Sequence, residues 1–401
     1  MDNNLLKEIT LKAGKEKSLL RRHPWIFSGA IESVSGNPSA GETVRVISAG
    51  GKTFGVGAYN LQSSIRIRMW DFDRGQEISQ EWLLEKMRIA ITLRRNLQII
   101  DKNNISCRLI FSESDGLPGL IVDRYDDWLV IQLLTVGSEK WRDEIINNLK
   151  ELTGLSNIYE RSDGDARQLE GLDERCGLVS GKMQDSPLKI LENGISYLVD
   201  IKNGHKTGFY LDQRENRFIV SEYAKNKRVL NCFAYTGGFT LPVLRGGTIQ
   251  VTSIESSREA INLAKNNQEL NGLQNESSHW ICGDVFQELR KLRDQDEKYD
   301  LIILDPPKFA PTASFAQAAA RGYKDINLLA FKLLNSGGLL VTFSCSGGIT
   351  REFFKKIISD AALDARAEVS IIRQLTQFQD HPINLAFPEG EYLKGFVCIK
   401  K

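Results

Sequence analysis

The sequence predicts an α/β protein whose largest part, residues 188–401, is a doubly wound parallel sheet. From about residue 188, short apolar segments alternate with segments whose apolar residues recur at helical spacing. Alternating β and α units of this length form parallel sheets with helices on both faces. Residues 1–77 instead contain short strand-like stretches separated by turn residues, and residues 78–187 mix both patterns, which predicts two smaller domains before the sheet.

The first domain, residues 1–77, is expected to be a compact β-barrel. Its clearest strands are predicted at 43–47, 54–59 and 64–70. The turn 48–52 joins the first two strands as a hairpin. The last strand alternates apolar residues with Arg66 and Arg68, which predicts a half-buried strand with a charged outer face.

The middle region, residues 78–187, is predicted to be a small α+β domain. Its expected helices are 81–97 and 140–152, and its expected strands lie near 107–111, 120–122, 128–134 and 157–161. In the C-terminal region a helix is expected at 257–271, and strands are expected at 228–232, 250–254, 301–304 and 339–343.

Length and composition limit the kind of protein. The 401 residues are 41% hydrophobic and 26% charged, as in ordinary water-soluble proteins. The apolar runs are far shorter than the ~20 residues that cross a bilayer, and segment 1–8 lacks the pattern of a secretory signal. Net charge is +1, so binding to nucleic acid would have to come from local basic patches.

The cysteines give information about the cellular compartment. Six are scattered through the chain without a CxxC pair, which fits neither a zinc site nor a disulfide framework and is typical of the reducing cytosol. We therefore expect a cytoplasmic protein without a bound metal. Cys232, Cys282 and Cys398 lie in or beside apolar strand-like segments, where cysteine usually only packs.

A glycine-containing turn follows the first strand of the C-terminal region. The turn, 233–239, includes Phe233, Tyr235, Thr236 and Gly237, and glycine lets the backbone approach a bulky ligand closely. Acids follow the next two strands: Glu255, with Ser256 beside it, can accept from ribose hydroxyls, and Asp284 can contact an adenine amino group.

This set favours a nucleoside cofactor over an ordinary turn flanked by surface acids. NAD is the competing cofactor, but the turn is not G-x-G-x-x-G and therefore lacks a pyrophosphate cradle. S-adenosylmethionine carries no phosphate, and it is the expected cofactor.

The segment Asp305-Pro306-Pro307-Lys308 follows an apolar strand. Two prolines hold the backbone extended and remove two amide donors. In amino methyltransferases a comparable turn grips the amino group of a flat base with its acid and prolyl carbonyls. The alternative is a rigid loop after a buried strand. Asp305 is the expected catalytic acid and an expected cofactor contact, with Pro306 and Lys308 facing the substrate.

Cys345 ends a second apolar strand, among Ser344, Ser346 and Gly347. Ligands bind at the carboxyl ends of parallel strands, so this thiol and Asp305 are expected to share one crevice. A thiolate that adds to carbon-6 of cytosine makes carbon-5 nucleophilic enough to take a methyl group. The alternative is a buried cysteine that only packs.

Two further segments allow a functional and a structural interpretation. The segment 205–214 contains Gln213 and Arg214 and either folds over the cofactor or begins an amphipathic helix with solvated Asp212 and Arg214. Lys17, Arg21 and Arg22 lie beside aromatic residues, and they form either an RNA-binding patch or a solvated charged face.

These motifs together resemble the bacterial ribosomal RNA large subunit methyltransferase I family. The resemblance runs over nearly the whole chain and rests on a set of short segments: 17–25, 113–119, 204–208, 210–214, 231–233, 305–309 and 344–346. Two small departures lie near the cofactor region, where Ala234 replaces the usual serine and Glu255 the usual aspartate.

The resemblance implies a function. It implies an N-terminal PUA domain (1–77), a central α+β domain (78–187) and a C-terminal class I, Rossmann-like methyltransferase domain (188–401) that makes 5-methylcytosine in 23S ribosomal RNA. By motif, Cys345 resembles the nucleophile, Glu255 and Asp284 the ribose and adenine contacts, and Gln213 and Arg214 part of the cofactor lid. The family also allows a homodimer, although no coiled-coil pattern in this sequence requires one.

Two other functions stay open at this point. The first is methylation of a base amino group, in which segment 305–308 grips the amine and Cys345 is inert. The second is a non-catalytic RNA-binding or ribosome-assembly factor. The intact set of Glu255, Asp284 and Cys345 argues against the latter.

Overall fold

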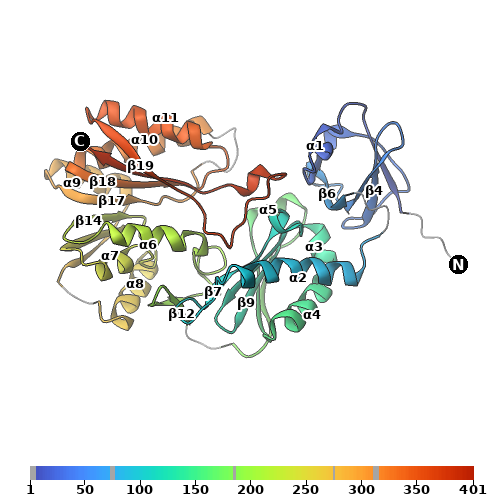
Figure 1. Cartoon of the computed structure of the whole chain (residues 1–401), viewed down its shortest axis with the longest axis horizontal. Helices are drawn as coiled ribbons and strands as arrows, with labels where there is room; N and C mark the ends of the chain where they lie inside the picture. The colour runs from blue at the N-terminus through green and yellow to red at the C-terminus, as the bar shows by residue number, and fades with distance from the viewer. Residues whose placement is uncertain (1–5, 73–76, 184–186, 274–275, 310–315) are drawn as a thin grey trace. The chain divides into compact units, whose positions relative to one another are not determined.

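The computed structural model describes residues 6–72, 77–183, 187–273, 276–309 and 316–401 (Figure 1). The chain divides into two compact units. The first contains residues 1–190, 199–211 and 380–390, and the second contains 191–198, 212–379 and 391–401. In the described ranges, no helix is both long and apolar enough to span a membrane.

The first unit begins with a β-rich module. Its six-stranded sheet has the order β2-β6-β5-β4-β1-β3. The elements of this module are β1 (Glu8–Leu11), α1 (Lys17–Leu20), β2 (Trp25–Phe27), β3 (Ile31–Val34), β4 (Thr43–Ile47), β5 (Thr53–Tyr59) and β6 (Ile65–Phe72). The three predicted strands and the hairpin between β4 and β5 are confirmed. The short strands β1, β2 and β3 were missed because each has only three or four residues, too few for a periodicity.

The second sheet of this unit has five strands in the order β11-β10-β9-β8-β7. Its helices and strands are α2 (Gln80–Asn96), β7 (Ser106–Phe111), β8 (Leu120–Tyr125), β9 (Trp128–Leu133), α3 (Val136–Lys140), α4 (Arg142–Thr153), β10 (Asn157–Ser162), α5 (Asp165–Leu169) and β11 (Arg175–Ser180). The start of α2 is fixed by Ser79, whose side chain accepts a hydrogen bond from the amide of Trp82.

The second unit contains a seven-stranded sheet in the order β16-β15-β14-β17-β18-β20-β19. The hairpin β12 (Leu188–Glu192) and β13 (Ile195–Val199) comes before it in the chain. The elements from there on are α6 (Arg214–Glu222), β14 (Arg228–Cys232), α7 (Thr240–Arg245), β15 (Gln250–Glu255), α8 (Arg258–Leu270), β16 (Ser278–Cys282), α9 (Val285–Asp294), β17 (Tyr299–Leu304), α10 (Ala316–Leu333), β18 (Leu334–Ser344), α11 (Arg351–Asp364), β19 (Val369–Leu375) and β20 (Lys394–Lys400).

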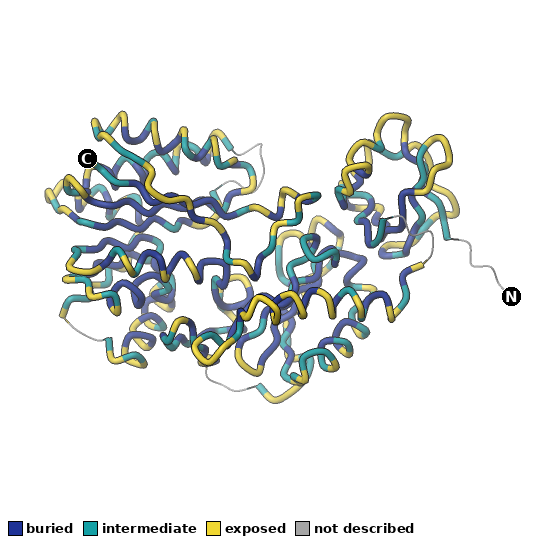
Figure 2. The backbone as a smooth tube through the Cα atoms, in the orientation of Figure 1, coloured by how far each residue is buried: buried dark blue, intermediate teal, exposed yellow. Residues whose placement is uncertain are grey.

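The doubly wound sheet is confirmed, with one difference. Helices α9, α10 and α11 pack on one face and α6 and α7 on the other, each over its own buried cluster. Figure 2 shows the central strands as the most deeply buried segments. The sheet is not wholly parallel, because β20 lies antiparallel to both β18 and β19. This reversal could not be predicted from the sequence, because fully buried strands of either direction are apolar.

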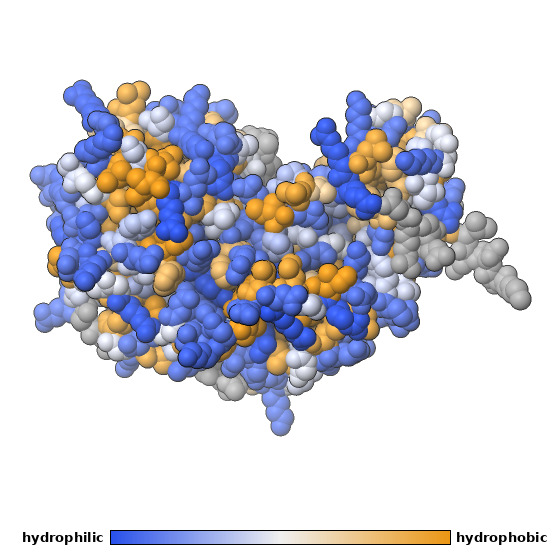
Figure 3. Space-filling view, viewed as in Figure 1, coloured by the Kyte–Doolittle hydropathy of each residue, from blue (hydrophilic) through white to orange (hydrophobic). Residues whose placement is uncertain are grey.

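Four 3-10 turns complete the described elements: 28–30, 112–115, 211–213 and 388–390. The face of the molecule seen in Figure 3 is covered mainly by hydrophilic side chains with apolar ones interspersed. The domain boundaries at 77/78 and 187/188 stay predictions, because each lies beside a segment outside the described residues.

Candidate active site

Two neighbouring strands bring the sequence motifs together. Strands β17 and β18 are parallel, and Leu304 is paired with Thr342, so the segments that follow them continue side by side. The thiol of Cys345 lies 3.9 Å from the carbonyl oxygen of Pro306, to which it can donate a hydrogen bond. The expected closeness of the two motifs is confirmed. They meet at the carboxyl ends of the strands, where ligands bind in sheets of this kind.

Cys345 differs from the packing cysteines in its surroundings. It is partly exposed, whereas Cys232 and Cys398 are fully buried, as expected for residues that only pack. Burial raises the pKa of the Cys398 thiol to about 12, so this thiol stays protonated. The expectation for Cys282 was wrong: this residue is exposed, because β16 is the edge strand of the sheet.

The Asp305 carboxylate is oriented by a chain of amides. The side chain of Gln213 donates to Asp305 Oδ1 at 3.0 Å. Asn216 in turn donates to Gln213 Oε1 at 2.6 Å and to the carbonyl of Thr376 at 2.9 Å. Because Gln213 and Asn216 are buried, this network fixes the direction in which Asp305 presents its carboxylate.

The glycine-containing turn has the geometry that a close ligand approach requires. Phe233, Tyr235 and Gly237 all have positive φ values, of 61°, 48° and 86°. Such a conformation is uncommon for residues with a side chain and marks strain that often accompanies function. The Thr236 hydroxyl oxygen is buried without a hydrogen-bond partner in the described part of the chain, so a polar group of a ligand could satisfy it.

The acids beside this turn are held by backbone amides. Glu255 accepts from the amide of Tyr235 at 2.8 Å and from that of Ser257 at 2.9 Å, and the Ser256 hydroxyl lies 3.2 Å away. Asp284 is exposed and caps α9 by accepting from the amide of Gln287. These features are compatible with a nucleoside cofactor that carries no phosphate. The assignment of individual cofactor contacts to Glu255, Ser256 and Asp284 stays a prediction.

Arg214 is buried rather than solvated. Its guanidinium lies 3.5 Å from Glu192 and stacks over the ring of Phe378 at 5.0 Å. Asp212 is also buried and accepts a hydrogen bond from the Tyr392 hydroxyl at 2.6 Å. The alternative of a solvated helix start is therefore wrong for 212–214. A contact between Arg214 and the cofactor stays a prediction.

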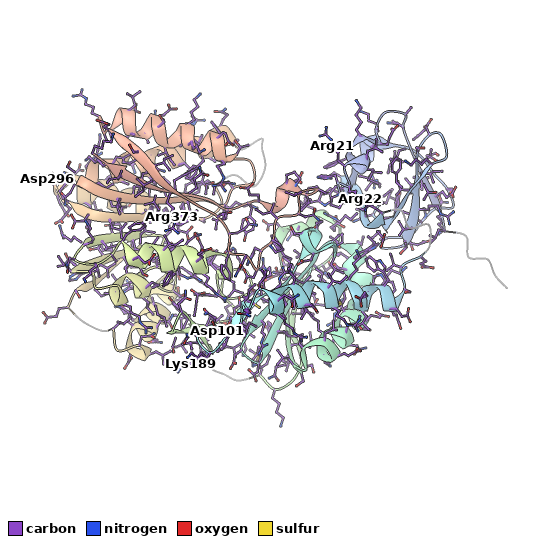
Figure 4. The ribbon with its side chains drawn as sticks, in the orientation of Figure 1. Arg21, Arg22, Asp101, Lys189, Asp296 and Arg373 are labelled. Atoms are coloured by element: carbon purple, nitrogen blue, oxygen red, sulfur yellow. The ribbon has the colours of Figure 1, made fainter. Side chains whose placement is uncertain are left out.

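The predicted RNA-binding residues lie in the first unit. Lys17, Arg21 and Arg22 are exposed in or just after α1, and Figure 4 labels the two arginines. Arg22 stacks over Phe72, with 5.6 Å between its guanidinium carbon and the ring centre. Their role in RNA binding stays a prediction.

The charged outer face expected for β6 is largely covered. Arg68 retains only 13% side-chain exposure, and it pairs with Glu113 at 2.7 Å and with Glu170 at 3.2 Å. The expectation was wrong because Glu113 and Glu170 cover Arg68. Both belong to the α+β part of the same unit and lie far from Arg68 in the sequence, so the pattern of the strand could not reveal them.

Two residues beside Cys345 were missed in the sequence. The Tyr323 hydroxyl lies 2.9 Å from Ser346 Oγ, and Lys394 donates to the carbonyl of Ser346 at 2.8 Å. Lys394 is the one charged residue in the apolar stretch 393–399, and that contrast was the available signal. Tyr323 lies on α10 and gave no signal, because an aromatic residue on a helix usually only packs.

Comparison with known proteins defines the class first. Residues 122–381 match the model of the S-adenosylmethionine-dependent methyltransferase family, and residues 9–72 match a PUA-like domain. The protein is therefore an S-adenosylmethionine-dependent methyltransferase with an N-terminal PUA-like domain, and S-adenosylmethionine is its cofactor.

The full-length relatives then give the particular family. The chain is 48% identical over 398 residues to "Ribosomal RNA large subunit methyltransferase I" of Klebsiella pneumoniae (strain 342), covering 99% of each chain. It is 49% identical over 389 residues to the protein of the same name from Aeromonas salmonicida (strain A449), covering 97% and 98%. The chain belongs to the ribosomal RNA large subunit methyltransferase I family.

Solved structures support the fold. A putative S-adenosylmethionine-dependent methyltransferase from Streptococcus mutans superposes with a TM-score of 0.85, at 22% identity, over 98% of this chain and 100% of that one. A putative methyltransferase complexed with SAH gives the same TM-score at 23% identity, over the same shares of the two chains. At this level of identity the likeness concerns the fold alone.

Proposed function

We propose that the protein methylates carbon-5 of a cytosine in 23S ribosomal RNA through a covalent bond to Cys345. Ribosomal RNA as the substrate is supported by the names of the full-length relatives. The observation that carries the chemistry is the partly exposed Cys345 thiol, 3.9 Å from the Pro306 carbonyl at the carboxyl ends of β17 and β18.

The chain supplies a nucleophile for the first step. The Cys345 thiolate adds to carbon-6 of the cytosine, a C–S bond forms, and the electron pair of the C5=C6 bond moves toward carbon-5. Bound S-adenosylmethionine supplies an electrophilic methyl group for that carbon. A base then removes the carbon-5 proton, the C5=C6 bond re-forms, and the C–S bond breaks to release the thiolate.

Asp305 supports the addition electrostatically. When the Asp305 carboxyl group shares a proton with the cytosine, it stabilises the negative charge that develops on the cytosine ring. Gln213 holds this carboxyl in a fixed direction, so little reorganisation is needed during the step. A target cytosine that is paired in the RNA must leave its helix to reach Cys345.

Nucleoside mass spectrometry tests this function. Large-subunit ribosomal RNA lacking the modification is incubated with the protein and methyl-labelled cofactor, then digested. We expect labelled 5-methylcytidine with the wild type and with Cys176→Ala, a matched change at an exposed cysteine in the first unit. Cys345→Ala should bind the cofactor normally and give no product.

Three results would contradict the proposal. A product methylated on the cytosine amino group would favour the alternative in which segment 305–308 grips the amine. Formation of 5-methylcytidine by Cys345→Ala would exclude the covalent route. The absence of any labelled nucleoside, with cofactor still bound, would favour a non-catalytic RNA-binding factor.

A further inference from the structure

A buried lysine lies beside the candidate nucleophile. Lys394 is the first residue of β20, and it is paired with Ser344 of β18, next to Cys345 in the sequence. It is only 4% exposed. Its ammonium group donates to the carbonyl oxygen of Ser346 at 2.8 Å, which ties the strand to the residue after Cys345.

A lysine so deeply buried needs compensation for its charge. Removing an ammonium from water is costly unless an anion or several acceptors lie close. Burial lowers the pKa of Lys394 to about 8, whereas a charge on Cys345 opposes this shift. In the described part of the chain, the charges of Arg351, Glu391 and Lys308 also act on the pKa of Lys394.

The other charged groups offset the charge of Lys394 less directly than a Cys345 thiolate does. Glu391 is already paired with Arg351 at 2.7 Å, and the two charges largely offset each other. Lys308 is exposed and adds further positive charge. Burial raises the pKa of Tyr323 to about 12, so this neighbour stays neutral at physiological pH. Because Glu391 is paired with Arg351, a Cys345 thiolate is the other anion among these groups that can balance the buried cation.

We propose that Lys394 is a positioning residue that stabilises the thiolate form of Cys345, which deepens the proposed function and rests on Cys345 being its nucleophile. The thiol proton leaves to water, and the ammonium then faces the negative sulfur. Through the Ser346 carbonyl the same group fixes the turn that carries the sulfur. The cation thus increases the fraction of thiolate that can add to the cytosine. When the C–S bond breaks, the electron pair returns to sulfur beside the same cation, which stabilises the leaving thiolate.

Alkylation of Cys345 as a function of pH tests this coupling without methyl transfer. Iodoacetamide reacts with the thiolate, and mass spectrometry of the Cys345 peptide separates this cysteine from the exposed Cys176 and Cys282. In the wild-type full-length protein, Cys345 should reach half-maximal rate at a lower pH than Cys176. Partial burial of its sulfur and the nearby Asp163 raise the pKa of the Cys176 thiol, so Cys176 gives an upper reference for the Cys345 midpoint.

Substitution of Lys394 should shift the dependence of the Cys345 alkylation rate on pH. Lys394→Met is expected to slow Cys345 alkylation at pH 7 by about tenfold, which corresponds to a shift of one pH unit in the midpoint. Lys394→Arg should restore part of the rate, because it keeps the charge. Lys400→Met is the matched control: Lys400 ends the same strand and donates to the carbonyls of Phe331 and Leu334, away from Cys345.

The coupling would be overturned by either of two results. The first is a Lys394→Met curve that coincides with that of Lys400→Met. The second, which needs no variant to fold, is a wild-type Cys345 midpoint at or above that of Cys176. Failure of the proposed function can be told apart from failure of this coupling. Methyl transfer by Cys345→Ala would refute the proposed function, but it would not change the alkylation curves of the wild type and the lysine variants.

Discussion

At the scale of single residues, the site combines one nucleophile with groups that orient it. Cys345 and Asp305 could be found in the sequence because each ends an apolar strand with residues that carry chemistry. The hydrogen bonds from Lys394 to Ser346 and from Gln213 to Asp305 could not, because each joins segments far apart in the sequence. The pairing of Ser344 with Lys394 becomes visible only when the antiparallel strand β20 is known.

The hydrogen bond from Gln213 to Asp305 leads to a prediction at this scale. Gln213→Leu keeps the side-chain volume but removes the donor at 3.0 Å from Asp305. The rate of methyl transfer at saturating cofactor should fall by about tenfold, since the lost bond to a charged group is worth ~1.5 kcal/mol. Single-turnover kinetics would measure this, and a Gln213→Leu protein with the wild-type rate would show that Asp305 needs no such support.

At the scale of elements, the site depends on how strands end and helices begin. The βα units of the second unit were predictable from their periodicity, and the turn after β14 from its glycines. Helices α8, α9 and α11 are capped by Ser257, Asp284 and Thr350, whose side chains accept from backbone amides. The strand order could not be derived, because sequence does not state which buried strands pair.

The turn after β14 gives the prediction at this scale. Gly237 has a φ of 86°, and an added Cβ would lie 2.6 Å from Leu241 Cδ1. Gly237→Ala should therefore lower the melting temperature and weaken cofactor binding by about tenfold, which corresponds to ~1.4 kcal/mol of strain in the turn.

The neighbouring glycine is the matched control. At Gly238 an added Cβ would meet Arg217 Cδ at 3.6 Å, an ordinary contact, and φ is not positive. Gly238→Ala should bind the cofactor almost as the wild type does, in isothermal titration calorimetry. Equal losses in the two variants would contradict a specific role for the Gly237 conformation.

At the scale of the whole molecule, each unit has its own stabilising contacts. In the first unit, the buried Glu113 accepts from Arg68 at 2.7 Å and from the Trp25 indole at 2.8 Å, which joins β2 and β6 to the α+β part. Sequence composition could predict the domain types but not this contact. The contact brings Glu113 together with Trp25, 88 positions away in the sequence, and with Arg68, 45 positions away. Hydrophobic periodicity indicates only local structure.

The Glu113 network predicts a pH dependence of stability. Burial alone would raise the pKa of Glu113, but Arg68 and the hydrogen bonds from Ser112 and Trp25 outweigh it, so the pKa lies below 4.5. A carboxyl with a lowered folded pKa stabilises the fold above its unfolded pKa, and this contribution is lost as pH falls through the folded value.

Glu113→Gln removes that charge while it preserves shape. At pH 7 it should lower the melting temperature of the first unit, because breaking a buried pair costs ~3 kcal/mol. The difference in melting temperature between Glu113→Gln and the wild type should become smaller as the pH falls below 4.5. Glu389→Gln, at an exposed partner of His23, should change little in the same calorimetric scans. A difference in melting temperature that does not change with pH would contradict the role of the Glu113 charge.

Trapping the adduct with RNA that contains 5-fluorocytidine tests the central claim most directly. Fluorine replaces the proton that must leave carbon-5, so a cytosine bound to Cys345 and methylated at carbon-5 cannot be released. We expect a complex that survives denaturing electrophoresis, with the nucleotide mass on the peptide that contains Cys345. A protein that turns over normal RNA yet gives no such complex, or one attached at another residue, would contradict the covalent mechanism.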